Sequence, residues 1–521
     1  MDVSTFHKML RFCADTYGDR SAVLYQDEEY SYNQLATAVE VCAETLKERG
    51  VKQGLHVALW GYNSAQWLIC FFGIIRAGGI PVLFNYSLTT EELALMFRYT
   101  DIRFIAYGNN REVKRNPTAA LQLAESLGIS QAAVFDIRSM DYKFASQHMR
   151  EGDFIPDDRD DAKRTSDFFL FTTGTTGRSK AVQISQRSFL VDSIEIGKAL
   201  PEMERRHTRF CLGSPLFHIL GLEMAIGNLF FGATVYIPPE FSAATLLQLF
   251  RRNRIDFVAA TGAVYMAMMG YPGFERNAAY LPRYALAGGG TVTPTQFERL
   301  ETVFGHTVFL NDYGQTEIGS TLTRIYPGDD KEKRLNSVGR PFQHKSVAIM
   351  APNGQLLPAG GQGEVVVRDD GNLMLGYYEL PTEQAIDENG WLHTGDLGFF
   401  DDDGFLYLNG RIKDIIIKGG ENISPREVEV ALSRCEKVSE VKVFGAPHPI
   451  WGESIEACIV PADGSIVTEQ ELKSFLSGLI APFKIPSHFF YYDAFPINAN
   501  GKLNQQALKV SMLEKLEQER S

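Results

Sequence analysis

The chain has 521 residues, a length that suggests two to four structural units. Hydrophobic residues make up 45% and charged residues 22%, as in an ordinary globular protein, and the net charge is −13. An acidic chain is a poor general nucleic-acid binder, because phosphate backbones are bound by clustered Lys and Arg, but a single nucleotide needs only local contacts. The six cysteines form no C-x-x-C pair, so neither a zinc cluster nor a disulfide framework is expected.

The best candidate for a membrane span is the apolar run at 67–75. Arg76 and the glycines after it end this run well short of the roughly 20 residues that a span needs, so we predict a buried core helix. The first residues lack a basic region followed by an apolar core, and we therefore expect no secretory signal, no transmembrane segment and a cytoplasmic protein.

Apolar runs alternate with amphipathic stretches through most of the chain, a pattern typical of α/β architecture. Strand-like runs stand at 256–260, 307–310 and 364–368, and the first follows a helix-like stretch at 244–252. The last part of the chain reads as a compact α+β unit, with strands at 415–417, 441–444 and 457–460. We predict an N-terminal domain at 1–409, with β-sheets flanked by helices in several subdomains, and a small mobile C-terminal domain at 410–521.

A glycine-rich loop follows the apolar strand that begins at Phe168. Glycines let backbone N–H groups approach an anion, hydroxyls add donors, and a lysine adds positive charge, so the segment indicates phosphate binding. It differs from a Walker A loop, because Arg178 and Ser179 separate the last glycine from the lysine, and a strand is expected after it instead of a helix. The alternative is a flexible surface hairpin. The residues are Thr172, Thr173, Gly174, Thr175, Thr176, Gly177 and Lys180.

This loop resembles the signature [ST]-[ST]-G-[ST]-T-G-x-P-K-G of the adenylate-forming superfamily, which includes acyl-CoA synthetases, peptide-synthetase adenylation domains and beetle luciferases. Ser179 stands where the family usually has Pro, and Ala181 where it usually has Gly. Four further motifs follow in the family's order and extend the resemblance over nearly the whole chain.

The second motif is similar to the family's Y-G-x-T-E segment, and it follows a predicted strand. The resemblance implies that Tyr313 stacks on adenine, that Thr316 donates to a phosphate and that Glu317 holds Mg²⁺, a hard cation that prefers oxygen ligands. Half-buried packing for Tyr313 and a solvated loop acid for Glu317 are the alternatives. The segment comprises Asn311, Asp312, Tyr313, Gly314, Gln315, Thr316 and Glu317.

The third and fourth motifs surround the predicted domain boundary. Asp396 lies in a T-G-D segment and is expected to accept hydrogen bonds from the ribose hydroxyls, with an ordinary turn as the alternative. In the fourth motif, Arg411 would contact the ribose or a phosphate, and Lys413 occupies the family's hinge position. Gly419 and Gly420 match the loop beside the family's CoA pantetheine tunnel.

The fifth motif, similar to P-x-x-x-x-G-K, makes Lys502 the predicted catalytic lysine, a compact cation between the substrate carboxylate and the α-phosphate. His218 lies in a segment similar to the P-x-[FY]-H-x-x-G of acyl-CoA synthetases and would sit beside the carboxylate end of the acid pocket. Gly288 and Gly289 resemble the family's glycine-rich loop beside adenine. Each has a structural alternative: a surface lysine, a core histidine and an ordinary turn.

Together the motifs imply a ligase that uses ATP and Mg²⁺ to convert a carboxylic acid into acyl-AMP, and then transfers the acyl group to the thiol of CoA. Three alternatives stay open: transfer to a carrier-protein phosphopantetheine, a catalytically dead nucleotide-binding relative, and a phosphotransferase. The sequence leaves the acid undetermined: the apolar residues near His218 suit a medium-chain, long-chain or aryl acid, and an amino or hydroxy acid stays open as a less expected alternative. It also leaves the oligomeric state open, a homodimer included.

Overall fold

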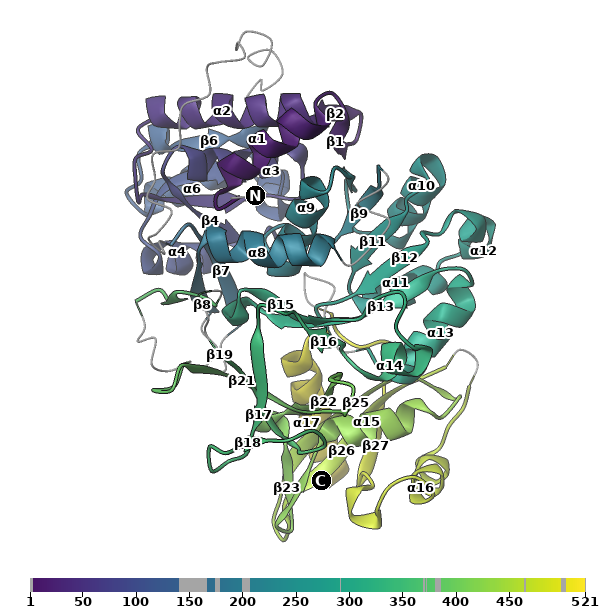
Figure 1. Ribbon diagram of the computed structural model, residues 1–521. Helices are drawn as coiled ribbons and strands as arrows, with labels where there is room; N and C mark the ends of the chain where they lie inside the picture. Colours follow the sequence, from purple (N-terminus) through teal and green to yellow (C-terminus); the bar gives the residue numbers. More distant parts are fainter. Residues whose placement is uncertain are drawn as a thin grey trace.

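The computed structural model describes residues 3–139, 166–173, 179–198, 207–290, 292–368, 371, 373–379, 386–462, 465–497 and 503–520. The chain is a mixed α/β fold, as predicted, with several sheets flanked by helices and a smaller C-terminal unit (Figure 1). Among the residues that the structure describes, none of the helices combines the length and apolar character that a membrane span requires.

The first large sheet contains the strand of the predicted phosphate loop. Its strands lie in the order β20-β8-β7-β4-β3-β5-β6; the strands from β7 to β6 are parallel, whereas β8 and β20 are added antiparallel at one edge. The two strands predicted around the loop form a hairpin in which Thr172 pairs with Lys180. The bounds are β3 (His56–Trp60), β4 (Ile80–Phe84), β5 (Ile102–Tyr107), β6 (Val134–Asp136), β7 (Phe168–Thr173), β8 (Ser179–Ile184) and β20 (Gly376–Tyr377).

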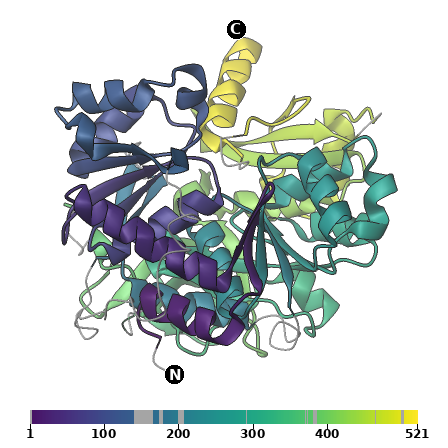
Figure 2. The same ribbon diagram turned by 90° about the horizontal axis from the view of Figure 1, so that it is seen from above.

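The second large sheet has the order β13-β12-β11-β9-β10-β1-β2 and is parallel except for its edge strand β2. The two large sheets lie side by side, with helices packed around them (Figure 2). Ligand sites in parallel sheets lie at the carboxyl ends of the strands, and the loops after β9, β12 and β13, which carry predicted motifs, stand at this edge. The bounds are β1 (Ser21–Tyr25), β2 (Glu28–Ser31), β9 (Arg209–Gly213), β10 (Thr234–Ile237), β11 (Phe257–Ala260), β12 (Tyr284–Ala287) and β13 (Val308–Leu310).

The helices of the N-terminal part pack on these sheets through buried apolar faces. The run at 67–75 is the middle of α3 and is fully buried, which confirms the predicted core helix. Local sequence explains several helix starts: at α13, Thr293 forms a capping box with Gln296, and Pro294 occupies the first turn. The helices are α1 (Phe6–Tyr17), α2 (Tyr32–Glu48), α3 (Ala65–Arg76), α4 (Thr90–Tyr99), α5 (Arg111–Arg115), α6 (Ala119–Ser126), α8 (Gln186–Gly197), α9 (Ile219–Phe230), α10 (Ala243–Asn253), α11 (Gly262–Met269), α12 (Phe274–Asn277) and α13 (Pro294–Phe304).

Two smaller antiparallel sheets connect the large sheets to the C-terminal unit. One contains β14 (Asp312–Gln315), β15 (Ser320–Arg324) and β16 (Arg340–Pro341), with η4 (Thr316–Ile318) between its first two strands and α14 (Lys331–Asn336) after the second. The other has the order β18-β17-β19-β21-β22. Its strands are β17 (Ser346–Met350), β18 (Leu356–Leu357), β19 (Gly363–Arg368), β21 (Trp391–Phe400) and β22 (Leu406–Arg411).

The C-terminal unit has its own sheet, in the order β24-β23-β26-β25 with β27 paired to β26, and its own apolar clusters. The chain passes from β22 to this sheet through η6 (Ile412–Asp414), so the sheets change within a few residues of the predicted division at 409/410. The elements are β23 (Ile416–Lys418), β24 (Glu421–Ile423), α15 (Pro425–Ser433), β25 (Val438–His448), β26 (Gly452–Pro461), α16 (Glu469–Ser477), β27 (His488–Tyr491) and α17 (Gln505–Arg520).

Candidate active site

Three predicted motifs follow the ends of three parallel strands of the second sheet. Gly288 follows β12, Asn311 follows β13, and the segment that carries His218 follows β9. The loops are close together: a Cβ on Gly288 would lie 2.5 Å from Asp312 Oδ1 and 3.1 Å from Leu220 Cδ2. Only a glycine fits between the Y-G-x-T-E segment and the start of α9, so the structure brings these motifs to one edge of the sheet.

His218 stands immediately before α9, at its N-cap position, in an aromatic wall. Its ring centroid is 4.5 Å from that of Phe217, which is 5.2 Å from Tyr86 in an edge-to-face contact. Tyr62 extends the wall, with its ring 4.3 Å from Tyr86. The rings beside His218 are therefore aromatic, and the acid pocket at this position stays a prediction.

Glu317 connects the second motif to the phosphate-loop strand. Its Oε1 accepts a hydrogen bond of 3.1 Å from Thr172 Oγ1 and another of 3.1 Å from the Tyr377 hydroxyl. Lys180 Nζ lies 4.5 Å from the centroid of the Tyr377 ring. Two motifs 145 residues apart thus meet at a carboxylate flanked by two hydroxyls, and Lys180 lies against the ring that carries one of them.

The donor atoms around Glu317 fit a hard divalent cation. They are carboxylate and hydroxyl oxygens, which Mg²⁺ prefers, and the two hydrogen bonds from Thr172 and Tyr377 both fall on Oε1. Within the described ranges, no three His, Cys, Asp or Glu side chains are grouped as a metal site. Mg²⁺ beside nucleotide phosphates is commonly held by only one or two carboxylates, and Glu317 is the carboxylate predicted to supply one.

Asp396 is the centre of a second polar cluster. Its Oδ2 accepts hydrogen bonds from the Tyr313 hydroxyl at 2.7 Å and from Gln315 Nε2 at 2.6 Å, and its Oδ1 lies 2.9 Å from Arg411 Nε. Burial raises the pKa of Tyr313, and the charge of Asp396 raises it further, so the phenol stays protonated and donates. The third and fourth motifs therefore meet the second one here.

Several residues of the second motif also hold the local fold. Asn311 Nδ2 donates to the Ser337 carbonyl at 3.3 Å, and Asp312 Oδ2 lies 3.5 Å from Arg324 Nη2 in the interior. A Cβ on Gly314 would lie 2.2 Å from the Ser320 carbonyl oxygen, which only a glycine avoids. Thr316 and Glu317 begin the short helix η4.

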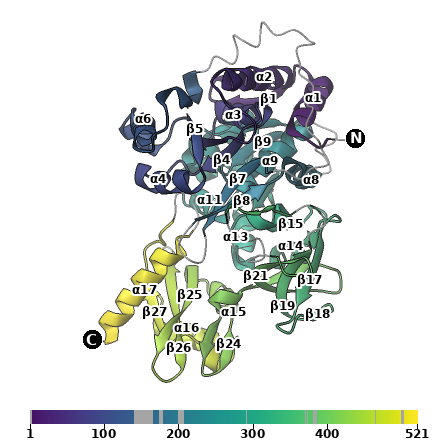
Figure 3. The same ribbon diagram turned by 90° about the vertical axis from the view of Figure 1, so that its left-hand side faces the viewer.

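The predicted hinge and tunnel residues lie on the C-terminal side of this site. Arg411 ends β22 with its side chain 49% exposed, and Lys413 is exposed in η6. Gly419 and Gly420 form the turn between β23 and β24 with φ of 61° and 87°, a left-handed pair that favours glycine. This hairpin lies at the far end of the C-terminal unit from β7 and β8 (Figures 1 and 3), so the structure does not bring the two glycines to the other motifs.

Five predicted residues lie outside the part of the chain that the structure describes: Gly174, Thr175, Thr176, Gly177 and Lys502. Thr173 ends β7 and pairs with Ser179 across the hairpin. Conversely, sequence reasoning missed Tyr377 and Gln315, which contact Glu317 and Asp396. Gln315 stands inside a recognised motif, whereas Tyr377 carries no local signal besides its aromatic ring.

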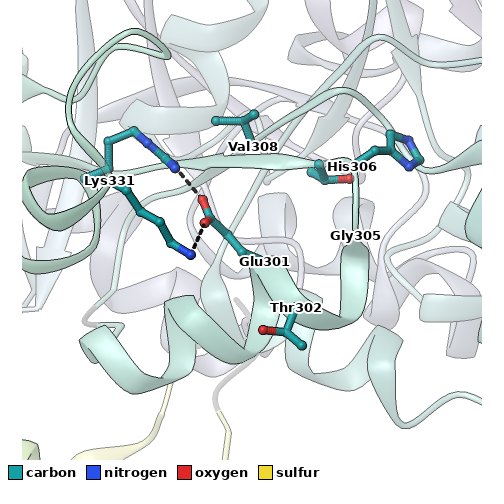
Figure 4. A pocket seen from close by; sticks show the side chains of 8 residues that line it. Glu301, Thr302, Gly305, His306, Val308 and Lys331 are labelled. Atoms are coloured by element: carbon teal, nitrogen blue, oxygen red, sulfur yellow. Dashed lines mark hydrogen bonds and ion pairs between the residues drawn. The ribbon is translucent and has the colours of Figure 1, made fainter.

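A surface pocket of about 240 Å³ lies away from these motifs, at the C-terminal end of α13 (Figure 4). Glu301 in its wall pairs with Arg334 at 2.5 Å and with Lys331 at 3.8 Å. None of the predicted site residues lines it. The pocket is therefore separate from the candidate site.

Known proteins share these features over almost the whole length of the chain. The AMP-binding enzyme family matches residues 10–378, and the AMP-binding enzyme C-terminal domain matches residues 427–502. Oxalate–CoA ligase of Arabidopsis thaliana is 30% identical over 527 residues, which cover 99% of this chain and 100% of that protein. Fatty acid–[acyl-carrier-protein] ligase ScoC of Streptomyces coeruleorubidus is 30% identical over 495 residues, covering 94% and 92%.

A solved structure gives the same result. The o-succinylbenzoate CoA synthetase MenE of Bacillus subtilis, in complex with the acyl-adenylate intermediate OSB-AMP, matches with a TM-score of 0.77 and 27% identity over 96% of this chain and 97% of that one. The chain belongs to the AMP-binding enzyme family. It is an AMP-forming acid–thiol ligase of the acyl-CoA synthetase type, which activates a carboxylic acid as acyl-AMP and passes the acyl group to a thiol.

Proposed function

We propose that this ligase joins a medium-chain, long-chain or aryl carboxylic acid to the thiol of CoA, with Mg²⁺-ATP as the activating substrate. The contact between Thr172 and Glu317 carries the proposal most directly, because it unites the phosphate-loop strand with the predicted metal-binding carboxylate. The aromatic wall beside His218 supports an apolar acid.

In the first half-reaction the carboxylate oxygen attacks the α-phosphorus of ATP, the bond to the β-phosphate oxygen breaks, and pyrophosphate leaves with its electron pair. The protein aligns the two reactants and neutralises charge. Lys180 and Lys502 supply positive charge, Thr316 donates a hydroxyl hydrogen bond, and His218 lies at the carboxylate end of the acid pocket. Mg²⁺ bound to Glu317 and the phosphates would offset their negative charge.

The Asp396 cluster is the proposed nucleoside site. Ribose hydroxyls are donors that a buried carboxylate can accept, and Arg411 and Tyr313 hold that carboxylate in place. Gly289 would leave room for the adenine ring beside Tyr313, whereas the missing Cβ of Gly288 lets Asp312 and Leu220 approach its backbone.

In the second half-reaction the thiol gives its proton to solvent and its sulfur attacks the acyl carbon. The bond from that carbon to the phosphate oxygen breaks, and AMP leaves with the electron pair. We propose that the C-terminal unit first turns about Lys413, withdrawing Lys502 and bringing the Gly419 hairpin to the site. The separate sheet and apolar clusters of this unit support rotation as a rigid body. The exposed position of Lys413, between two sheets, suits a pivot.

The surface beside the hairpin favours CoA over a carrier protein as the acceptor. Trp451 is 52% exposed and its backbone carbonyl accepts from the Gly419 N–H at 2.8 Å. Phe483 is 42% exposed, and its carbonyl accepts from Lys418 Nζ at 3.1 Å. Exposed aromatic rings with lysines nearby suit a phosphorylated nucleotide, which CoA carries and a carrier protein lacks. The similarity to ScoC keeps transfer to a carrier protein as the second candidate.

The test is pyrophosphate release from Mg²⁺-ATP with a panel of fatty and aryl acids, each with and without CoA. The proposal predicts turnover that requires CoA and yields AMP. Release of a single equivalent that stalls with CoA, and resumes with a phosphopantetheinylated carrier protein, would establish the second candidate.

The acceptor surface has its own test. Trp451→Ala is expected to raise the KM for CoA roughly tenfold while leaving pyrophosphate release in the first turnover unchanged. Ile466→Ala, at an exposed position in the same unit, is the control. An unchanged KM for CoA in the Trp451 variant would contradict a CoA nucleotide site on this surface.

A further inference from the structure

Tyr377 lies at the candidate site although no motif contains it. It belongs to β20, a two-residue strand that returns to the first sheet almost two hundred residues after β8 and pairs with it, Tyr377 opposite Val182. Since alternate residues of a strand share a face, this pairing places Tyr377 beside Lys180, two residues from its partner. Tyr377 is 8% exposed, so its ring is held in place.

The side chain makes two different contacts with predicted catalytic groups. Its hydroxyl donates to Glu317 Oε1 at 3.1 Å, and its ring centroid lies 4.5 Å from Lys180 Nζ. A hydrogen bond to a carboxylate fixes the direction in which its other oxygen points. A ring face attracts an ammonium group and restricts a long, flexible side chain. One residue therefore constrains both the predicted metal-binding carboxylate and the lysine of the phosphate loop.

We propose that Tyr377 is a positioning residue for Mg²⁺-ATP, which orients Glu317 through its hydroxyl and Lys180 through its ring. The inference rests on the proposed function, since it assigns Glu317 to Mg²⁺ and Lys180 to a phosphate. Thr172 on β7 donates to the same oxygen of Glu317. The carboxylate is therefore fixed by two donors, one from β7 and one from β20. Loss of either contact would leave Glu317 more conformations from which to bind the ion.

The two contacts can be separated by substitution. Tyr377→Phe keeps the ring and removes the hydroxyl, whereas Tyr377→Leu removes both. Tyr378→Phe is the matched control: Tyr378 follows β20 directly, and its ring packs on His56 and Phe169. The readout is ATP affinity by titration calorimetry, once with Mg²⁺ and once with EDTA, after thermal melting has shown that each variant is folded.

For Tyr377→Phe we expect roughly tenfold weaker binding of ATP with Mg²⁺, because Glu317 loses a hydrogen bond that orients it toward the ion. In EDTA the ion is absent, so the affinity for ATP should stay within about twofold of the wild type. Tyr377→Leu should weaken binding in EDTA as well, because Lys180 loses its ring. Tyr378→Phe should match the wild type in both conditions.

Equal losses with Mg²⁺ and EDTA in the Tyr377→Phe variant would mean a purely structural role and would overturn the inference, as would no loss at all. ATP binding by the wild-type protein distinguishes failure of this inference from failure of the proposed function. If the wild-type protein bound no ATP in either condition, the proposed function would fail and the inference with it. If it bound ATP and the variants did not differ from it, only the inference would fail.

Discussion

Arg426 Nη2 donates a hydrogen bond of 3.0 Å to the Val292 carbonyl oxygen. The bond joins α15 of the C-terminal unit to the loop between Gly288 and α13, on the edge of the second sheet where the motifs gather. Ser433 Oγ lies 3.3 Å from Thr295 Oγ1 and adds a second contact between α15 and α13. The observed arrangement of the C-terminal unit is thus held by contacts that the proposed rotation about Lys413 would have to break.

This contact predicts unequal effects on the two half-reactions. In the observed arrangement the Gly419 hairpin lies away from the site (Figures 1 and 3), as proposed for the first half-reaction. Arg426→Ala removes a charge-assisted hydrogen bond that holds this arrangement, so it should slow acid-dependent ATP–pyrophosphate exchange roughly tenfold. Transfer from preformed acyl-AMP to CoA should change less than threefold. Arg434→Ala, at the exposed end of α15, is the control. Equal slowing of both half-reactions by Arg426→Ala would contradict a role in domain arrangement.

The Asp396 cluster predicts selectivity for the sugar. Asp396→Asn weakens the ion pair with Arg411 and should raise the KM for ATP roughly tenfold or more. In the wild type, 2′-deoxy-ATP and 3′-deoxy-ATP should bind more weakly than ATP, because each lacks one donor for this carboxylate. The variant should lose most of that discrimination. A variant that still distinguished the deoxynucleotides as strongly as the wild type would exclude Asp396 as the ribose-binding group.

A Lys502 variant tests whether this residue acts in the first half-reaction alone. Lys502→Ala should reduce pyrophosphate release by on the order of a hundredfold, since a charge that stabilises the transition state is removed. Conversion of supplied acyl-AMP and CoA to acyl-CoA should continue near the wild-type rate, because that step needs no charge at this position. Rapid-quench measurement of each half-reaction gives both rates, and full retention of adenylation would refute the predicted catalytic role.

Glu223 predicts a pH-dependent stability. It is fully buried on α9 and accepts a 3.0 Å hydrogen bond from Thr321 Oγ1. The other polar and charged groups that face it are Asp192 on α8, Asp312 on β14, and Ser320 and Arg324 on β15. Burial, helped by the charge of Asp192, raises the pKa of Glu223 to about 8. The folded state therefore binds a proton that the unfolded state releases at lower pH, and stability falls as the pH rises from about 5 to about 8.

Glu223→Gln removes this proton uptake and should flatten the dependence, at most about 1.4 kcal/mol per pH unit, in denaturant titrations from pH 5 to 8. Glu471→Gln is a control at a carboxyl whose pKa is shifted in the opposite direction. Hydrogen bonds from Lys437 and Thr468 lower the pKa of Glu471 to about 2, so its contribution to the free energy of unfolding is nearly constant from pH 5 to 8. An unchanged slope in the Glu223 variant would show that this carboxyl does not take up the proton.

Local patterns predicted much of this architecture. The hairpin of β7 and β8 agrees with an apolar strand and a second expected strand on either side of a glycine-rich loop, and α3 follows from an apolar run too short for a membrane. Family resemblance predicted Glu317 and Asp396 as site residues, and the structure brings each of them together with another predicted motif, at Thr172 and at Arg411 respectively.

The rest depends on contacts between distant segments. β20 has only two residues, and nothing in Gly376 or Tyr377 predicts pairing with β8, so the position of Tyr377 follows from tertiary packing alone. The contact of Arg426 with Val292 depends on how the C-terminal unit sits, which no local pattern specifies. These are the residues for which the structure adds most to the sequence.

The most direct test of the central claim follows an oxygen atom. An acid substrate labelled with ¹⁸O in its carboxylate is incubated with Mg²⁺-ATP and CoA, and the products are analysed by mass spectrometry. If the acid attacks the α-phosphorus, one labelled oxygen stays on the phosphate when the thiol displaces AMP, so AMP gains one ¹⁸O and pyrophosphate gains none. Formation of ADP with the label in inorganic phosphate would show attack at the γ-phosphorus and would contradict acyl-AMP formation.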